Sequence, residues 1–159
     1  MAKSELSKIG RTAKRAVIGT VKGAGETAEA IVETTRDLLR VSVDGVADIA
    51  VATEKAVGQI VAGAVEASVE VGEDVMLAIK SAVRGTVRGA AEVGADVGKT
   101  AVAGVEGAIK AAGEIGEDTA EAIEQATTGA IEAAEEIGTE TVDAVRNVLK
   151  TTVKGKSSK

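Results

Sequence analysis

The chain has 159 residues, of which 45% are apolar, and it contains no aromatic residue, histidine, cysteine or proline. The apolar content excludes a typical disordered chain, and the missing cysteines exclude disulfide bonds and thiolate metal sites. The net charge is −6, and 19 residues are glycine. Without proline to interrupt it or aromatic side chains to anchor an ordinary core, the chain is expected to form long helical structure from Val, Ile, Ala and Thr.

The first 22 residues are strongly basic. Their only acid is Glu5, and their bases are Lys3, Lys8, Arg11, Lys14, Arg15 and Lys22. Residues 1–5 are expected to lead into a helix. The longest uncharged run, 56–65, is about half of what a membrane-spanning helix needs, and the N-terminus lacks the apolar stretch of a signal peptide. We therefore expect a soluble cytoplasmic protein that can associate with membranes or lipid through basic and apolar side chains.

Residues 6–153 follow an eleven-residue repeat. Stepping by eleven from Leu6, from Val21 and along three neighbouring tracks meets almost only apolar or small residues, and between residues 6 and 153 the five tracks hold one charged residue, Glu54. Eleven residues make three turns of about 3.67 residues, so these tracks share one face of a helix, and a supercoil of such helices is right-handed. The pattern predicts an all-α protein: one very long amphipathic helix that assembles into a right-handed coiled coil or an α-helical barrel.

The apolar stripe of this helix is the predicted contact surface for other helices or for lipid. Its large members are Val17, Val21, Ile31, Val32, Leu39, Val43, Val46, Val57, Ile60, Val61, Val65, Val75, Met76, Ile79, Val83, Val87, Val97, Val105, Ile109, Ile123, Ile131, Val142, Val145 and Leu149. The stripe covers an arc of roughly 130°, wider than the seam of a two-helix coiled coil, which predicts an assembly of more than four helices.

A second period of 22 residues is clearest over 61–148, where EVGED, EVGAD, EIGED and EIGTE stand at equivalent places. Each glycine inside a helix costs about 1 kcal/mol relative to alanine, so an isolated helix would be marginally stable and its folding would depend on burial of the stripe. A helical hairpin is the rival structure. No proline or polar cluster marks a loop near the middle, which favours the continuous helix.

Residues 154–159 form a basic tail that is expected to be disordered. Between Ala111 and Val145, by contrast, there are ten acids and no base. The acidic groups 70–74 and 114–118 could meet a divalent cation, but a solvated helix face is the preferred interpretation. Catalysis needs an oriented nucleophile, base or metal, and the sequence offers none, so we expect no enzymatic activity and no cofactor. The acidic balance and the missing aromatics disfavour nucleic acid as a partner.

Val, Ala, Thr and Gly on the apolar side of an eleven-residue repeat, as in 21–30 (VKGAGETAEA), resemble the synucleins and the perilipin-type lipid-droplet proteins. The pattern is also similar to natural right-handed coiled coils with eleven-residue repeats. The first resemblance implies extended helices that bind lipid surfaces.

Two functions are therefore expected. The preferred one is a structural homo-oligomer, a tube or filament whose apolar lumen holds fatty acids or phospholipids. The alternative is a coat protein that lies flat on a membrane, droplet or granule as an amphipathic helix. The partner is the chain itself in the first case and lipid in the second.

Overall fold

The computed structural model describes residues 7–23, 27–44 and 46–157, and in these ranges the chain forms seven helices. They are α1 (Lys8–Gly23), α2 (Thr27–Val43), α3 (Ile49–Val71), α4 (Val75–Glu92), α5 (Val97–Glu114), α6 (Thr119–Ile137) and α7 (Thr139–Ser157). Side chains are described for 7–21, 27–44 and 46–151.

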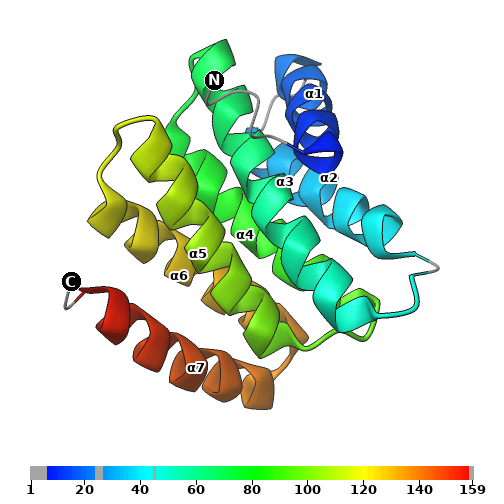
Figure 1. Ribbon diagram of the computed structural model, residues 1–159, viewed down its shortest axis with the longest axis vertical. Coiled ribbons are helices and arrows are strands. Elements are labelled where there is room, and N and C mark those ends of the chain that lie inside the picture. Colours follow the sequence, from blue (N-terminus) through cyan, green and yellow to red (C-terminus); the bar gives the residue numbers. More distant parts are fainter. Residues whose placement is uncertain (1–6, 24–26, 45, 158–159) are drawn as a thin grey trace.

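The helices form two layers. Each helix packs on the helix two places along the chain, α1 on α3, α3 on α5, α5 on α7, and likewise α2 on α4 and α4 on α6. In Figure 1 the layer of α1, α3, α5 and α7 crosses the front of the molecule, with α2, α4 and α6 behind it. Sequential helices run in opposite directions, so the helices within one layer are parallel. The fold is a helical repeat in which one helix and its turn form one 22-residue unit.

The prediction of one very long helix is wrong, and with it the predicted coiled coil or barrel of such helices. The chain reverses at the glycines of the 22-residue motif: Gly72, Gly94 and Gly116 have φ values of 78°, 79° and 79°, which glycine adopts without strain. Two residues later Asp74, Asp96 and Asp118 accept hydrogen bonds from backbone N–H groups of the next helix. Glycine ends one helix and aspartate begins the next.

These turns resemble one another in detail. The backbone N–H groups of Glu73, Ala95 and Glu117 each donate to the carbonyl oxygen five residues earlier at 2.8 Å, which completes a left-handed C-cap. The motif changes at Gly138, where no aspartate follows, and α7 starts at the next residue. α7 extends to Ser157, beyond residue 153, where the helical repeat was predicted to end.

Helix packing buries the stripe within a single chain. Sixteen of its 24 large members are buried, seven are partly buried, and Val46 is 37% exposed. The partly buried members are Val75, Met76, Val97, Ile109, Ile123, Ile131 and Val142. The eleven-residue phase therefore identifies the buried face of each short helix, whereas the sequence was interpreted as showing the face of one long helix.

Candidate functional site: the groove between α3 and α5

Glycines at one position of the 22-residue unit bring parallel helices of a layer together. A Cβ atom placed on Gly63 would clash with the backbone of α1, one on Gly85 with α2, and one on Gly129 with α4. A Cβ on Gly107 would lie 3.1 Å from the Cα of Gly58 in α3. The sequence predicts that small residues beside the stripe allow close approach, and these contacts have that form.

Ion pairs cross the outer side of most of these helix pairs. Between α1 and α3, Lys14 Nζ lies 3.5 Å from Glu66 Oε1 and 3.2 Å from Glu70 Oε1. Hydrogen bonding to Glu70 is the main cause that raises the pKa of Lys14. Between α2 and α4, Arg40 Nη1 lies 3.5 Å from Glu92 Oε1. In each case the earlier helix supplies the cation and the later helix supplies the acid.

The same arrangement is densest between α4 and α6. Arg84 contacts both Glu132 and Glu136, while Lys80 reaches Glu132 at 4.0 Å and Arg88 reaches Glu136 at 3.4 Å. The hydrogen bond to Glu136 is the main cause that raises the pKa of Arg84. These pairs are partly exposed, so each contributes at most about 1 kcal/mol. Their main structural effect is to cover the valley between two parallel helices.

The valley between α3 and α5 lacks this bridge. Subtracting one 22-residue unit from Arg84, Glu132 and Glu136 gives Ala62, Lys110 and Glu114. An alanine thus stands where the cation would be, and a lysine replaces the first acid. No salt bridge joins α3 to α5 among the residues that the structure describes, and a groove of about 580 Å³ lies open there.

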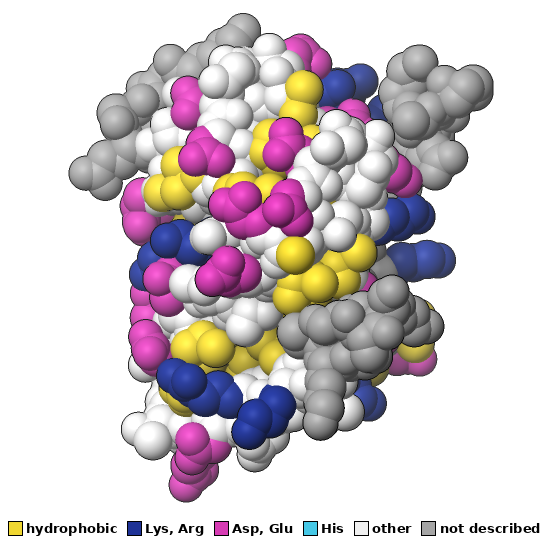
Figure 2. All heavy atoms as spheres, turned by 90° about the vertical axis from the view of Figure 1, so that its left-hand side faces the viewer, with side chains coloured by type: hydrophobic (Ala, Val, Ile, Leu, Met, Phe, Trp, Pro, Cys, Tyr) yellow, Lys and Arg dark blue, Asp and Glu magenta, His cyan; other side chains and the backbone are white. Residues whose placement is uncertain are grey.

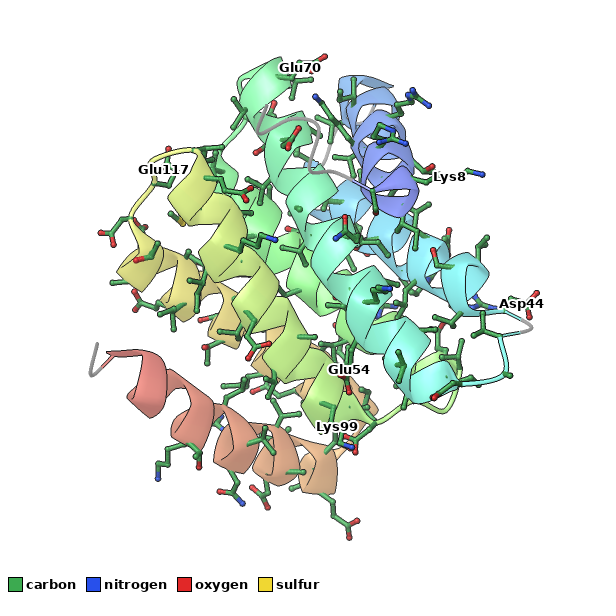
Figure 3. All side chains as sticks on the ribbon, viewed as in Figure 1. Lys8, Asp44, Glu54, Glu70, Lys99 and Glu117 are labelled. Atoms are coloured by element: carbon green, nitrogen blue, oxygen red, sulfur yellow. The ribbon has the colours of Figure 1, made fainter. Side chains whose placement is uncertain are left out.

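The groove has a floor of small residues and charged banks. Its floor is formed by Gly58, Ala62, Ala103, Gly107 and Ala111. Toward the start of both helices it carries Lys55 and Lys99 with Glu54, and toward their ends it carries Glu66, Glu106 and Glu114 with Lys110. Figure 3 shows Glu54 and Lys99 near each other at one end of the α3 and α5 pair. One end of the groove is therefore net cationic and the other net anionic.

Sequence reasoning did not identify this groove. Gly58 was recognised only as a small residue flanking the stripe, and Ala62 was not singled out. The available signal is the break in the pattern of Lys14, Arg84 and their acids at Ala62. That signal becomes visible only when it is known that each helix contacts the helix two places along the chain, and not its immediate successor alone.

The acidic groups 70–74 and 114–118 lie at two of the turns. Glu70 pairs with Lys14, while Asp74 and Asp118 cap α4 and α6. Within the described ranges no three carboxylates are placed to hold a metal ion. The hydroxyl groups of Thr86 and Thr100 donate to carbonyl oxygens of their own helices, which accounts for their polarity without a reaction. In the same ranges no helix is both long enough and apolar enough to cross a bilayer.

No protein-family model matches the chain. No curated protein matches it either. The chain is similar to a solved structure, the de novo designed helical repeat protein DHR7, with 19% sequence identity, a TM-score of 0.42, and coverage of 94% of this chain and 95% of that chain. A likeness at this level carries no information on function.

Proposed function

We propose that this chain is a structural, non-catalytic helical repeat protein that pairs with a second copy of itself through the groove between α3 and α5. The observation that carries the proposal is the missing ion-pair bridge at Ala62, Lys110 and Glu114, which leaves a small-residue floor open between charged banks. Small side chains let two helix pairs approach closely, and the area they leave uncovered is available to a partner.

The charges of the groove favour a two-fold arrangement. A second copy laid antiparallel across the groove brings its cationic end, with Lys55 and Lys99, over the anionic end of the first copy, with Glu66 and Glu114. The two-fold axis repeats the same pairing on the other side, as in most homodimers. Opposite charges then select this orientation over the parallel one, in which like charges would meet.

Cross-linking tests this arrangement, because the natural chain has no cysteine. Ala103 lines the groove near its centre. We expect Ala103→Cys to form a disulfide-linked dimer under mild oxidation, with a yield that rises with protein concentration and falls with salt. Exposed Ala120 on α6, substituted in the same way, is the matched control and is expected to cross-link poorly.

Ala62→Arg supplies the missing cation and fills the groove, as Arg84 does between α4 and α6. It is expected to abolish cross-linking through the introduced cysteine without loss of thermal stability. Combining it with Lys110→Glu reproduces the residue types of Arg84, Glu132 and Glu136 and is expected to stabilise the fold further. Unchanged cross-linking in Ala62→Arg, or none in the parent, would overturn the proposal.

A lipid-surface coat is the second proposal, and the composition of the C-terminal core favours it. The residues of α6 that are buried are Ala122, Ala126, Gly129, Ala130, Ala133 and Ala134, with no large side chain among them. Ile109, Ile123 and Ile131 remain partly buried. Because burial of alanine contributes little free energy, α5–α7 form the part of the bundle that can most easily turn its isoleucines toward lipid.

Hydrogen exchange with and without vesicles tests this second proposal. Anionic phospholipid vesicles are expected to bind the protein and to increase amide exchange at the contacts of α6 with α4, while contacts between α1 and α3 stay protected. Flotation with zwitterionic vesicles serves as the control for charge. Absence of vesicle binding, or binding with an unchanged exchange pattern, would contradict the coat.

A further inference from the structure

Exposed apolar side chains gather at the connection between α2 and α3. Of the seven large apolar residues that are exposed in the described chain, four lie between residues 41 and 51. These are Val41, Val46, Ile49 and Val51, and we refer to them as the 41–51 patch. Val41 is 73% exposed and Val51 is 61% exposed. A cluster of exposed valines and isoleucine on a soluble helical protein marks a surface for a partner.

The patch coincides with the place where the chain departs from its repeat. The capping aspartates Asp74, Asp96 and Asp118 are 22 residues apart, whereas Asp48 precedes Asp74 by 26 residues. The four extra residues add about one turn to the start of α3, and this turn carries Ile49 and Val51. Beside it lies a shallow hollow of about 760 Å³ that Val41, Val43, Ile49 and Val93 line.

Acids surround the hollow. Asp37, Asp44 and Glu92 line it, and its one cation, Arg40, is paired with Glu92. A suitable occupant therefore combines an apolar side chain with cations. The C-terminal half of α7 has this chemistry: Arg146 and Lys150 are exposed on either side of Val148, which is itself 39% exposed, and no acid follows Asp143 in the chain.

The two surfaces lie on opposite sides of the molecule. Asp44 is at the right-hand tip of Figure 3, while α7 lies at the lower left of Figure 1. Figure 2 views the side on which α7 lies, and shows Lys and Arg side chains beside apolar surface in the lower part of this face, with acids above. One molecule can thus offer both surfaces at once without bending.

We infer that α7 of a second copy docks on the 41–51 patch, with Val148 against the valines and with Arg146 and Lys150 against Asp37 and Asp44. The two partners use different surfaces, so the contact leaves a free patch at one end and a free α7 at the other, and further copies can add. This end-to-end contact goes beyond the pairing proposed for the groove, since it uses neither α5 nor the groove floor.

Sedimentation velocity of the Ala62→Arg protein tests the end-to-end contact with the groove filled. Association into a concentration-dependent series of oligomers is expected. Val51→Glu and Lys150→Asp should each reduce association at least tenfold, and Asp44→Lys combined with Lys150→Asp should restore much of it. Lys8→Asp, at another exposed lysine, should have little effect. All these sites are exposed, so the variants are expected to fold normally.

Mixing gives the sharpest outcome. Val51→Glu blocks the patch and leaves α7, whereas Lys150→Asp blocks α7 and leaves the patch, so an equimolar mixture is expected to form a 1:1 dimer and to stop there. Failure of this dimer, or association unaffected by both substitutions, overturns the inference. The groove proposal fails separately, if Ala62→Arg leaves cross-linking through a cysteine at position 103 unchanged.

Discussion

The close contact at Gly129 provides a direct test of how the two layers are held together. A Cβ atom on Gly129 would press on the carbonyl oxygen of Lys80, with the carbonyl carbon at 3.1 Å and the amide nitrogen of Arg84 at 3.3 Å. These are backbone atoms in the middle of α4 and cannot rotate away. In Gly129→Ala, α6 must therefore move outward along its contact with α4.

The expected magnitude follows from two opposing effects. Overpacking of this kind costs about 1–3 kcal/mol, whereas alanine gains about 1 kcal/mol over glycine as a helix former. The net loss in the free energy of unfolding is about 1–2 kcal/mol. Gly19→Ala is the matched control, because a Cβ on Gly19 would meet no atom within 4 Å. It should stabilise α1 by about 0.5–1 kcal/mol.

Thermal unfolding followed by circular dichroism and urea titration measure the difference. For a chain of this size, about 2–3 kcal/mol between the two variants corresponds to melting temperatures roughly 5–10 °C apart, with Gly19→Ala the higher. If both alanines stabilise the protein to the same extent, the helices do not approach as closely as the structure shows, and glycine at this position has no packing role.

Three further substitutions test the turns, the core and the ion pairs. Gly94→Ala places a side chain at φ 79° and should lower the free energy of unfolding by about 1–2 kcal/mol in urea titration. Thr53 is 1% exposed and its hydroxyl has no hydrogen-bond partner among the described residues, so Thr53→Val should raise stability by about 1 kcal/mol, whereas Thr86→Val, which removes a bonded hydroxyl, should not. The raised pKa of Lys14 means that its stabilising effect is complete below its ordinary pKa of 10.5 and is lost as pH rises through the higher folded-state pKa, so the stability difference from Lys14→Met should shrink only in alkaline urea titrations.

The eleven-residue phase was readable from the sequence because every helix must turn one apolar face to the core, whichever way it runs. Val61, Val83 and Val105 are one unit apart and all are buried. The same phase concealed the turns. Since 22 residues equal about six turns at 3.67 residues per turn, a helix and its connection together return the apolar face to the same phase, and the pattern passes through the turn unshifted.

The turns nevertheless carry a local signal. In EVGED, EVGAD and EIGED a glycine precedes an aspartate by two residues, which is the order of a C-terminal glycine and an N-terminal capping aspartate. Interpreted as part of a helical stripe, Gly72, Gly94 and Gly116 count as small members of an apolar track. Interpreted as turn residues, they explain why the repeat period is 22 and not 11, because only every second unit contains a turn.

The groove was beyond prediction for a different reason. Its residues lie on α3 and α5, which are separated by α4, and the sequence pattern alone favours neither this pairing nor a contact between successive helices. Only the positions of the helices show that Ala62 faces the acid at Glu114 and the lysine at Lys110, and that the cation found at Lys14 and Arg84 is missing there.

The start of the array shows why association at the ends need not continue the repeat. Moving α2 by 48 residues, from 27–43 to 75–91, superposes it on α4 in sequence, and the same step relates Arg15 to Gly63 and Asp37 to Gly85. Arg15 and Asp37 are exposed, and no helix precedes α1 or α2 in the described chain. Charged side chains at these positions prevent the close backbone contact that Gly63 and Gly85 make, so another unit cannot pack on this end as units pack within the chain. A partner must instead meet charge with charge, as Arg146 and Lys150 of α7 would meet Asp37 and Asp44.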